Sequence, residues 1–509
     1  MERFGVIDLG SNSVRLNIVQ VYDNGAYNLL DQAKVMVRLS ENLQGDCQLK
    51  AEPMERTIHA VKLFKKLLNA HEVKCVIAVA TAAVRMAANG ELFLKRLKEE
   101  TEIEFQIISG HEEAYYDYLG AVNTLDLDNY VMIDIGGGST EIALIENRQL
   151  KESISLPFGS VILTEVFMDT DDRKMGITKA EAYVHSAIKT LPWLKKAIGY
   201  PVVGMGGVVR TLGKIDKQKK KFPAVSLHNY QISRKETFQM IKRLAESQPQ
   251  EIAQIPGTSK DRADILGPGV VPLKILMEHI KSEKFIVSGN GLRDGLFFET
   301  YFQLRGEHLI LDNVLEHSLL NVMKRYQIDN PHSKHVAMLS IKLFDELLEL
   351  HMFDEQDRKI LYVGSMLHDI GMHIEYYNHH RHGFYLTLNS RVYGLNNEET
   401  IMAAFVVAMH REAKFKEDIE PYKLVVDKAK IERLKKLSLF LRMAEKLDRS
   451  ESQVVKNLKV DADASTVKLS ILSDENTDLE KQSTEEFAKE FAEFYGKTLE
   501  IFSVGKSIT

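Results

Sequence analysis

One segment near the start of this chain occurs twice. Residues 5–19 (GVIDLGSNSVRLNIV) align without a gap on residues 131–145 (VMIDIGGGSTEIALI), at a constant offset of 126 residues. In each copy an apolar run ends in an aspartate, a short Gly/Ser segment follows, and a second apolar run begins. This pattern predicts two domains that each begin with a strand, a tight turn and a second strand.

The turns of the two copies carry residue types that bind phosphate. Gly and Ser leave backbone N–H groups open, and a concave run of such groups cradles phosphate oxygens. Asp8 and Asp134 end the two first strands, where a carboxylate can hold hydrated Mg²⁺ against the same phosphates. A single hairpin of this kind is more simply an ordinary turn whose aspartate satisfies its own backbone. Two copies in register favour a phosphate-binding cleft between two domains.

Two further glycine segments follow short apolar runs in the same part of the chain. GMGG (204–207) comes after residues 202–203 and precedes a helical pattern that contains Arg210. SGNGLRDG (288–295) comes after residues 285–287. One strand–glycine–helix turn is a weak signal because such turns are common. Four glycine turns at strand ends of one α/β region indicate a shared site.

The pattern of apolar residues changes twice along the chain. Residues 1–305 alternate strand-like and helix-like runs, as in an α/β region. From about residue 306 helical periodicity dominates and histidines become dense. Near the end, strand-like runs at 458–460, 467–471 and 499–504 surround a helical stretch at 479–494. We therefore expect four domains, over residues 1–124, 125–305, 306–455 and 456–509.

The composition excludes several functional classes. The chain of 509 residues has 66 basic and 72 acidic side chains and a formal net charge of −6, so a global basic field for nucleic acid is absent. No apolar stretch reaches the roughly 18 residues that a membrane helix needs. The first residues enter a strand pattern without the apolar core of a signal peptide. We expect a cytoplasmic protein with no nucleic-acid and no membrane partner.

Further motifs carry a resemblance to a known family. Collinear segments accompany the two repeated turns: ATAAVR (80–85), SGHEEAYYDYLG (109–120), SLPFGSVILTE (155–165), GMGGVVRTL (204–212), DRADILGPG (261–269) and SGNGLRDG (288–295). The turns resemble those of the actin-like ATPase superfamily. The full set resembles its exopolyphosphatase/guanosine-pentaphosphate phosphatase (Ppx/GppA) branch, over residues 1 to about 305. Sugar kinases and chaperones of the superfamily lack the GxEEA and GLRDG elements in these places.

The resemblance implies a fold and a chemistry. The fold is an α/β actin-like (ribonuclease H-like, ASKHA) half of two domains, followed by an all-α HD-like domain and a small α/β tail. The chemistry is metal-assisted hydrolysis of a terminal phosphoanhydride by water, which depends on charge neutralisation and an oriented nucleophile. Asp134 with Glu141, and also Asp8, would hold the Mg²⁺. The residues expected to bind phosphate oxygens are Ser11, Asn12, Ser13, Arg85, Gly136, Gly137, Gly138, Ser139, Thr140, Gly206 and Gly207.

The attacking water needs a carboxylate beside it. Glu113 matches the family's catalytic glutamate, the acid directly before Ala114, and Glu112 is its neighbour. Adjacent residues of a helix point about 100° apart, so only one of the two can face the cleft. Without the resemblance, both are more simply acidic residues that compensate the dipole of a helix's first turn. With it, Glu113 is expected to orient the water.

A basic segment follows the third glycine loop. Its members are Lys214, Lys217, Lys219, Lys220 and Lys221. Such a run is equally well explained as a solvated surface segment. At the edge of the cleft it would attract a long polyanion.

The helical region holds a second candidate metal site. Asp448 continues an apolar helical stripe, where an unpaired carboxylate is costly and a cation partner is expected. His335, His368, Asp369 and Asp448 resemble the H…HD…D signature of the HD metal-phosphohydrolases. Such ligands suit Mn²⁺, Fe²⁺ or Mg²⁺ better than a structural zinc.

Other histidines of this region are assigned less directly. His380, His382 and His410 are candidates to support the HD-like ligands or to bind a second metal. His373 and His379 are expected to lie on a helix surface or to be hydrogen-bonded.

The expected activity is removal of terminal orthophosphate from inorganic polyphosphate, with Mg²⁺ in the cleft. The same cleft would accept pppGpp, cleaved to ppGpp, and no motif separates the two substrates. A second alternative places hydrolysis in the HD-like domain, with the N-terminal half sensing polyphosphate or nucleotide. A third is a binding module that does not hydrolyse its ligand. The family resemblance also implies a homodimer.

Overall fold

The computed structural model describes residues 1–41, 43, 47–170, 172–328, 331–412 and 419–505 of the chain. The chain forms two compact units. The first is Met1–Phe222 with Ser226–Val314, and the second is Pro223–Val225 with the chain from Leu315 onward. The main part of the second unit begins at Leu315, and the expected domain boundary at residue 306 stays a prediction. The finer boundaries inside each unit stay predictions.

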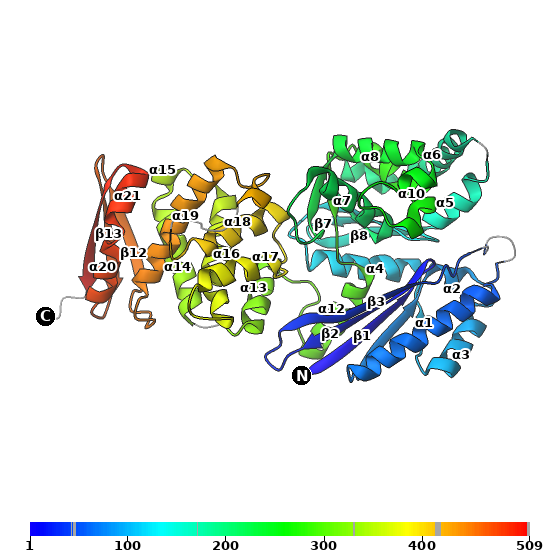
Figure 1. Cartoon of the computed structure of the whole chain (residues 1–509), viewed down its shortest axis with the longest axis horizontal. Coiled ribbons are helices and arrows are strands. Elements are labelled where there is room, and N and C mark those ends of the chain that lie inside the picture. Colours follow the sequence, from blue (N-terminus) through cyan, green and yellow to red (C-terminus); the bar gives the residue numbers. More distant parts are fainter. Residues whose placement is uncertain (42, 44–46, 171, 329–330, 413–418, 506–509) are drawn as a thin grey trace. The chain divides into compact units, whose positions relative to one another are not determined.

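The first unit contains two mixed sheets (Figure 1). The first sheet has the order β3-β2-β1-β4-β5. β1, β2 and β3 form an antiparallel meander, and β4 and β5 continue from β1 in parallel. The strands are β1 (Glu2–Leu9), β2 (Ser13–Val21), β3 (Tyr27–Met36), β4 (Cys75–Ala80) and β5 (Gln106–Ile107).

The second sheet repeats this arrangement and adds one strand. Its order is β10-β11-β9-β6-β7-β8, with an antiparallel meander from β6 to β8 and parallel pairing of β6, β9 and β11. The strands are β6 (Tyr130–Ile135), β7 (Thr140–Glu146), β8 (Gln149–Leu156), β9 (Val202–Met205), β10 (Tyr230–Ser233) and β11 (Lys284–Val287). The two copies of the repeated segment form the hairpins β1–β2 and β6–β7. The prediction of a duplicated strand–turn–strand start is confirmed.

The central strands are apolar along both faces because helices cover both faces of a sheet. On β1, for example, Val6 packs in one core cluster with Phe297 and Phe298, whereas Ile7 packs in another with Phe64. Strands buried on both sides read as continuous apolar runs and lose the alternation of half-exposed strands. This explains why the repeated segments look so uniformly apolar.

The helices of the first unit follow the strands in an alternating order. The α-helices are α1 (Ala51–Ala70), α2 (Ala82–Met86), α3 (Gly90–Thr101), α4 (Gly110–Val122), α5 (Ser160–Phe167), α6 (Arg173–Lys189), α7 (Gly206–Lys220), α8 (Arg234–Glu246), α9 (Pro249–Ile252), α10 (Ala263–Gly269), α11 (Val271–His279) and α12 (Leu292–Arg305). Two 3-10 helices are η1 (Pro192–Ala197) and η2 (Lys260–Arg262).

Helices α4 and α12 pack unusually closely, and two glycines make this possible. A Cβ atom on Gly295 of α12 would lie 1.9 Å from the carbonyl oxygen of Tyr116 in α4. A Cβ atom on Gly120 of α4 would lie 2.5 Å from the carbonyl oxygen of Gly291, directly before α12. The packing brings the N-terminus of α12 beside α4, and both helices contribute to the pocket described below.

The second unit begins with a helical region. Its α-helices are α13 (Val314–Arg325), α14 (Pro331–Glu346), α15 (Leu348–His351), α16 (Glu355–Leu367), α17 (His379–Asn389), α18 (Asn397–Ala408) and α19 (Lys428–Leu447), and its 3-10 helices are η3 (His368–His373) and η4 (Glu420–Tyr422). Asp354 and Asn396 begin α16 and α18 with capping boxes, which fix where these helices start. Among the described residues no helix has both the length and the apolar character that crossing a membrane demands.

A small α/β segment ends the second unit. Its sheet has the order β12-β13-β14, and its elements are β12 (Asn457–Ala462), β13 (Thr466–Ser473), α20 (Asp478–Glu485), α21 (Ala488–Tyr495) and β14 (Thr498–Gly505). The single helix expected over residues 479–494 is two short helices. Arg442 of α19 donates two hydrogen bonds to Glu490 of α21, at 2.9 and 2.6 Å, which ties this segment to the helical region.

Candidate active site

The two repeated turns lie against each other at one pocket of the first unit. Gly10 and Gly136 each donate a backbone N–H to the serine carbonyl three residues on, at 3.2 and 3.0 Å. A Cβ atom on Gly138 would lie 2.8 Å from Ser11 Oγ, so the two turns approach each other closely at this glycine. The shared turn geometry follows from the shared sequence, and the glycine permits the close approach.

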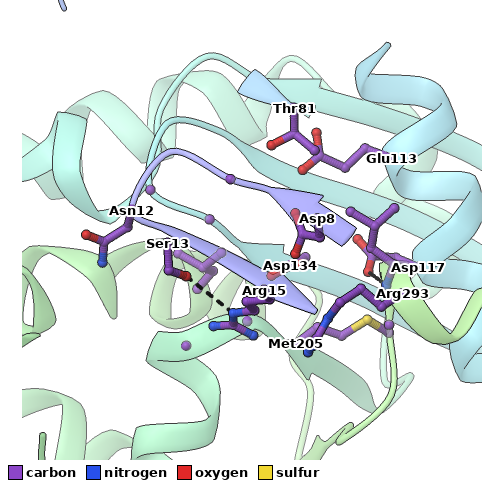
Figure 2. A pocket seen from close by; sticks show the side chains of 18 of the residues that line it. Asp8, Asn12, Ser13, Arg15, Thr81, Glu113, Asp117, Asp134, Met205 and Arg293 are labelled. Atoms are coloured by element: carbon purple, nitrogen blue, oxygen red, sulfur yellow. Dashed lines mark hydrogen bonds between the residues drawn. The ribbon is translucent and has the colours of Figure 1, made fainter. Parts of the chain in front are cut away.

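The pocket is lined by both sheets. Figure 2 shows Asp8 and Asp134 at neighbouring strand ends, with Glu113 and Thr81 on one side of Asp8 and Arg15 and Arg293 on the other. The predicted phosphate-binding residues that line it are Ser11, Asn12, Ser13, Gly136, Gly137, Ser139, Gly206 and Gly207. The structure thus brings most of the predicted phosphate-binding residues together in one pocket. That they bind phosphate stays a prediction.

One repeat position differs in charge between the two copies. In β1–β2, Asp8 lies directly opposite Arg15, and in β6–β7, Asp134 lies directly opposite Glu141. Directly opposed residues of an antiparallel pair project from the same face. Each hairpin therefore presents a charged pair at the cleft end, one acid–base and one acid–acid. Sequence reasoning overlooked Arg15, although the offset of 126 residues aligns it with Glu141.

The two adjacent glutamates of α4 have different positions, as the helix geometry predicts. Ser109 and Glu112 form a capping box, in which the Glu112 side chain accepts the Ser109 backbone N–H at 2.7 Å and stays exposed. Glu113 is only 9% exposed and lines the pocket. Arg85 donates to Glu113 Oε2 at 3.2 Å and to the carbonyl of Ile108 at 2.7 Å, which fixes the carboxylate.

Asp117 is a pocket residue that sequence reasoning missed. It lies one helical turn after Glu113 on α4, is 1% exposed and accepts the backbone N–H of Leu292 at 2.7 Å. The spacing of four residues from Glu113 is the signal that could have identified it. Its contact with the first residue of α12 depends on the close packing of the two helices, which the sequence does not reveal.

Burial raises the pKa values of all five carboxyl groups at this site. Burial, together with the charge of Glu141, raises the pKa of Glu113 well above its usual range. Burial and the charge of Asp134 raise the pKa of Glu141 to about 7, and raise that of Asp117 well above its usual range. The pKa values of Asp8 and Asp134 are also raised by burial, against the opposing charges of nearby arginines. Five buried acids in one place are costly without a cation.

These five buried carboxyl groups suit a hydrated Mg²⁺ ion. Asp134 Oδ1 and Asp117 Oδ2 are buried and have no hydrogen-bond partner. Among the described residues, Asp8, Asp134 and Glu141 do not form a cluster with ligand atoms within 4.8 Å of one another. Mg²⁺ keeps several waters and is commonly bound through one or two carboxylates, so it does not need such a cluster. Asp134, with Asp8 and Glu141 nearby, would hold the ion.

Four arginines also line the pocket: Arg15, Arg210, Arg262 and Arg293. Within the described residues none of them makes a salt bridge within 4.0 Å. Burial and the neighbouring positive charges lower the pKa of Arg210 to about 9 and that of Arg262 to about 10. A Cβ atom on Gly207 would lie 1.3 Å from Arg262 Nη1, so this glycine makes room for the guanidinium. We call these four side chains the arginine wall.

The wall continues into an adjoining hollow. The hollow is lined by the same four arginines and by Lys34 and Lys214. Of the predicted basic run, Lys214 is therefore at the site. Lys220 instead pairs with Asp216 at 2.8 Å and Glu236 at 3.0 Å, and Lys219 and Lys221 are exposed.

Several predicted residues have other positions. Thr140 is fully buried at the start of β7, and its hydroxyl donates to the carbonyl of Phe158 at 2.7 Å, so its side chain is structural and does not face the pocket. Glu141 is 1% exposed and accepts a hydrogen bond from Ser155 at 2.7 Å. Arg85 faces a small neighbouring hollow that it shares with Ser139, and reaches the pocket through Glu113.

The predicted metal quartet of the helical region is only partly brought together. His368 and Asp369 lie at the junction of α16 and η3, with His368 Nε2 3.3 Å from Asp369 Oδ2. His332, one helical turn before His335 on α14, joins them, whereas His335 does not belong to the cluster. The helix begins at Pro331, and its first turn is the part that faces Asp369. His332 therefore replaces His335 in the predicted set.

Asp448 has a different relation to the cluster. It is fully buried, and its Oδ2 lies 2.8 Å from Nδ1 of His332. Its Oδ1 accepts the backbone N–H of Gln453 at 2.8 Å. Asp448 thus orients His332 from behind, as carboxylates commonly do for metal-bound histidines. His379, expected at a surface or in a hydrogen bond, is 3% exposed and lies 3.5 Å from Asp369.

Comparisons with known proteins agree with this architecture. The model of the Ppx/GppA phosphatase family matches residues 18–303, and that of Ppx/GppA phosphatase domain III matches residues 314–487. The chain is similar to a solved Ppx/GppA family member from Aquifex aeolicus, with 27% identity and a TM-score of 0.51 over 60% of this chain and 99% of that one. A solved exopolyphosphatase from Cytophaga hutchinsonii has 26% identity and a TM-score of 0.54, with the same two coverages.

The family matches cover both units of the chain. They agree with the expected α/β half, and the helical region with its α/β segment follows it in the expected order. The likeness of the helical region to HD phosphohydrolases stays a prediction. Since the first family model alone spans more than half of the residues, the chain belongs to the Ppx/GppA phosphatase family.

Proposed function

We propose that the first unit is an exopolyphosphatase, which releases terminal orthophosphate from inorganic polyphosphate. One observation carries this proposal: the pocket has buried carboxylates with Glu113 on one side and the arginine wall on the other. The acids suit a divalent cation and an attacking water, and arginines that have no salt bridge among the described residues suit a polyanion. The family membership supports a phosphatase but does not specify this substrate.

The side chains would divide the work of hydrolysis. The backbone N–H groups of the two turns would bind oxygens of the terminal phosphate. Glu113 would orient the water and accept its proton, with Arg85 holding the carboxylate in place. Bound Mg²⁺, held by Asp134, would neutralise charge on the phosphate oxygens. Water oxygen bonds to the terminal phosphorus, the P–O bridge breaks, and the shortened chain leaves with the bridging oxygen.

The lining of the site favours inorganic polyphosphate over pppGpp. The arginine wall and the adjoining hollow with Lys34 and Lys214 extend the positive surface beyond one phosphate. Among the described residues that line the pocket and this hollow, none is aromatic. Proteins commonly hold unpaired bases by stacking them on aromatic rings. A chain of phosphates therefore matches the site better than a guanine nucleotide.

The test compares two adjacent glutamates. Phosphate release is measured from long polyphosphate and from pppGpp with Mg²⁺, for wild type, Glu113→Gln and Glu112→Gln. The matched control, Glu112→Gln, removes one acid from the same helical turn but at an exposed cap. We expect Glu113→Gln to lower kcat by about 10²–10⁴-fold, the usual contribution of a positioned proton acceptor. Glu112→Gln should retain activity.

The same experiment can overturn the proposal. Turnover of polyphosphate that survives Glu113→Gln would remove the hydrolytic centre from this pocket. A kcat/KM higher for pppGpp than for polyphosphate would reverse the substrate assignment and leave the pocket as the hydrolytic centre. Both outcomes are read from the same set of initial rates.

A further inference from the structure

We propose that Asn17 is a positioning residue of the arginine wall, which holds Arg293 in place without neutralising its charge. An amide at this position keeps the guanidinium both oriented and available to a polyanion, whereas a carboxylate would pair with it. The polyanion is inorganic polyphosphate, as in the function proposed above, on which this inference rests. Asn17 does not belong to the pocket lining, so it would act through Arg293.

The strand register places Asn17 beside the wall. It lies on β2 two residues after Arg15, so the two side chains project from the same face of the strand. On the neighbouring strand β3, Gln32 lies directly opposite Asn17 and Lys34 directly opposite Arg15. Directly opposed residues share a face of the sheet. These four adjacent positions are therefore two bases and two amides, with no acid among them.

Asn17 contacts Arg293 directly. Nη1 of Arg293 donates to Oδ1 of Asn17 at 2.5 Å, although the two residues are 276 positions apart in the chain. A guanidinium only donates hydrogen bonds, so the amide oxygen is the atom that faces it. Arg293 lies in the first turn of α12 and lines the pocket. The bond orients its guanidinium, which has further N–H groups for a ligand.

The position of Asn17 in a buried strand supports this role. Asn17 is 7% exposed, and its neighbours Leu16 and Ile18 are fully buried. A buried amide costs free energy unless it is hydrogen-bonded, and Arg293 supplies such a bond. A third apolar residue would suit the core equally well, so the amide serves the arginine.

Two other arginines of the wall are also held by uncharged acceptors. Nε of Arg15 donates to the hydroxyl oxygen of Ser13 at 3.3 Å (Figure 2). Nε of Arg210 donates to the carbonyl oxygen of Gly206 at 3.1 Å. Hydroxyl, carbonyl and amide oxygens orient a guanidinium but leave its positive charge for another partner.

The charge of Arg293 therefore lacks a close counter-charge. Burial and the positive charge of Arg15 lower its pKa, while the charges of Asp8 and Asp294 oppose this change. Among the described residues neither acid forms a salt bridge with Arg293, and Asp294 instead accepts the backbone N–H of Gly291 at 3.0 Å. A cation in such a place is costly, and a bound polyanion would supply the missing negative charge.

The second copy of the repeat lacks both features. The offset of 126 residues aligns Asn17 with Ala143 of β7, as it aligns Arg15 with Glu141. The second hairpin contributes no arginine to the wall, and alanine has no side-chain acceptor to hold one. The amide and the wall arginine thus occur together, in the first hairpin.

The experiment changes the acceptor at position 17. Asn17→Asp keeps the size of the side chain and adds a charge, whereas Asn17→Ala removes the acceptor. Each full-length variant is titrated with long polyphosphate in the presence of a chelator, so that binding is measured without hydrolysis. We expect Asn17→Asp to weaken binding by about tenfold to hundredfold, the effect of losing one charge-assisted contact. Its thermal unfolding midpoint should not fall, because the carboxylate gains an ion pair with Arg293.

The salt dependence of binding separates the charge of Arg293 from its position. Basic side chains that contact a polyanion release its counterions, so the slope of log affinity against log salt concentration reports the number of such contacts. Asn17→Asp should reduce this slope by about one, because Arg293 is then neutralised by its new partner. Asn17→Ala should weaken binding but keep the slope, because Arg293 stays charged.

A matched control adds the same charge at another place. Asn147→Asp introduces a carboxylate in the exposed turn between β7 and β8, and should leave affinity and slope nearly unchanged. Wild-type affinity, an unchanged slope or a lower unfolding midpoint in Asn17→Asp would each overturn the role of Asn17. A wild type that binds no polyphosphate would overturn the proposed function, and this inference with it.

Discussion

At the scale of single residues, the pocket depends on a difference between the two repeat copies. Arg15 stands where the second copy has Glu141, and both residues lie opposite an aspartate. At this position the first hairpin therefore adds Arg15 to the arginine wall, and the second adds Glu141 to the buried acids. The motif D-x-G identifies both turns in the sequence, but the charge at this position determines what each turn attracts.

Lys34 gives the site a pH dependence that can be predicted. It lines the hollow beside the arginine wall, and partial burial with the charges of Arg262 and Arg15 lowers its pKa to about 8. The lysine is charged below this value and neutral above it, so attraction of a polyanion should weaken as the pH rises through 8. We expect kcat/KM for long polyphosphate to fall over this range.

The substitution Lys34→Arg tests this cause. An arginine stays charged at every pH of the assay, so the fall in kcat/KM near pH 8 should become smaller or disappear. The measurement compares kcat/KM of wild type and Lys34→Arg between pH 7 and 9, because this constant reports groups of the free enzyme. Identical profiles for the two proteins would contradict the role of Lys34.

The sequence predicts site residues best where a local pattern fixes the geometry. The two turns repeat, and Glu112 and Glu113 are separated by the angle between adjacent helix residues, so their positions follow from the chain itself. Asp117 was missed because Leu292, whose N–H it accepts, is distant in sequence, whereas Arg15 was missed although the repeat aligns it with Glu141. The resemblance pointed to His335, whereas His332 lies in the cluster, because spacing alone does not tell which turn of α14 faces Asp369.

At the scale of elements, the buried strands of the two sheets in the first unit were predicted and the edge strands of these two sheets were not. β1, β6, β9 and β11 are short apolar runs, whereas β3 and β8 alternate exposed polar residues at the edges of their sheets. An edge strand has one neighbour and one solvated face, so its composition resembles that of a loop. The tail helix was predicted as one piece because residues 486–487 keep helical periodicity although the helix is interrupted there.

The crossing of α4 and α12 offers a test at this scale. Gly295→Ala would place a Cβ atom 1.9 Å from the carbonyl oxygen of Tyr116, and a backbone oxygen has little freedom to move. We expect a loss of about 1–3 kcal/mol in the free energy of unfolding, which outweighs the gain of up to about 1 kcal/mol in helix propensity. Activity should also fall, because Asp117 is held by the first residue of α12.

A control on the same helix distinguishes packing from propensity. Gln303→Ala adds a good helix former at an exposed position of α12 and should leave stability and activity nearly unchanged. Chemical denaturation and phosphate release measure both variants. Wild-type stability in Gly295→Ala would show that the two helices can separate without cost.

At the scale of the whole molecule, the two compact units should respond to different ligands. The single tryptophan, Trp193, lies in η1 of the first unit, so its fluorescence follows that unit alone. Circular dichroism follows both units. We expect Mn²⁺ to raise the unfolding midpoint of the second unit, which circular dichroism records and fluorescence does not. The midpoint recorded by fluorescence should stay unchanged, because a ligand stabilises the unit that binds it.

The comparison is made in an Asp134→Asn background, with and without Mn²⁺, by recording both signals in one thermal scan. Asp369→Asn should abolish the shift, because both groups of possible ligand atoms include this carboxylate, and His335→Gln should retain it. Equal shifts of the two signals in every variant would mean that the units unfold as one cooperative block.

The exchange of Glu141 for Arg15 between the repeats has a consequence for how a substrate lies in the cleft. Two identical hairpins would give a site with twofold symmetry, in which a linear chain could enter in either of two equivalent ways. The exchange breaks that symmetry and gives the cleft a fixed polarity, from a cation-binding side to an anion-binding side. A polyphosphate chain would then lie in the cleft in one orientation, with its terminal phosphate at the cation-binding side. A cyclic polyphosphate, which has no terminal phosphate, would not be hydrolysed.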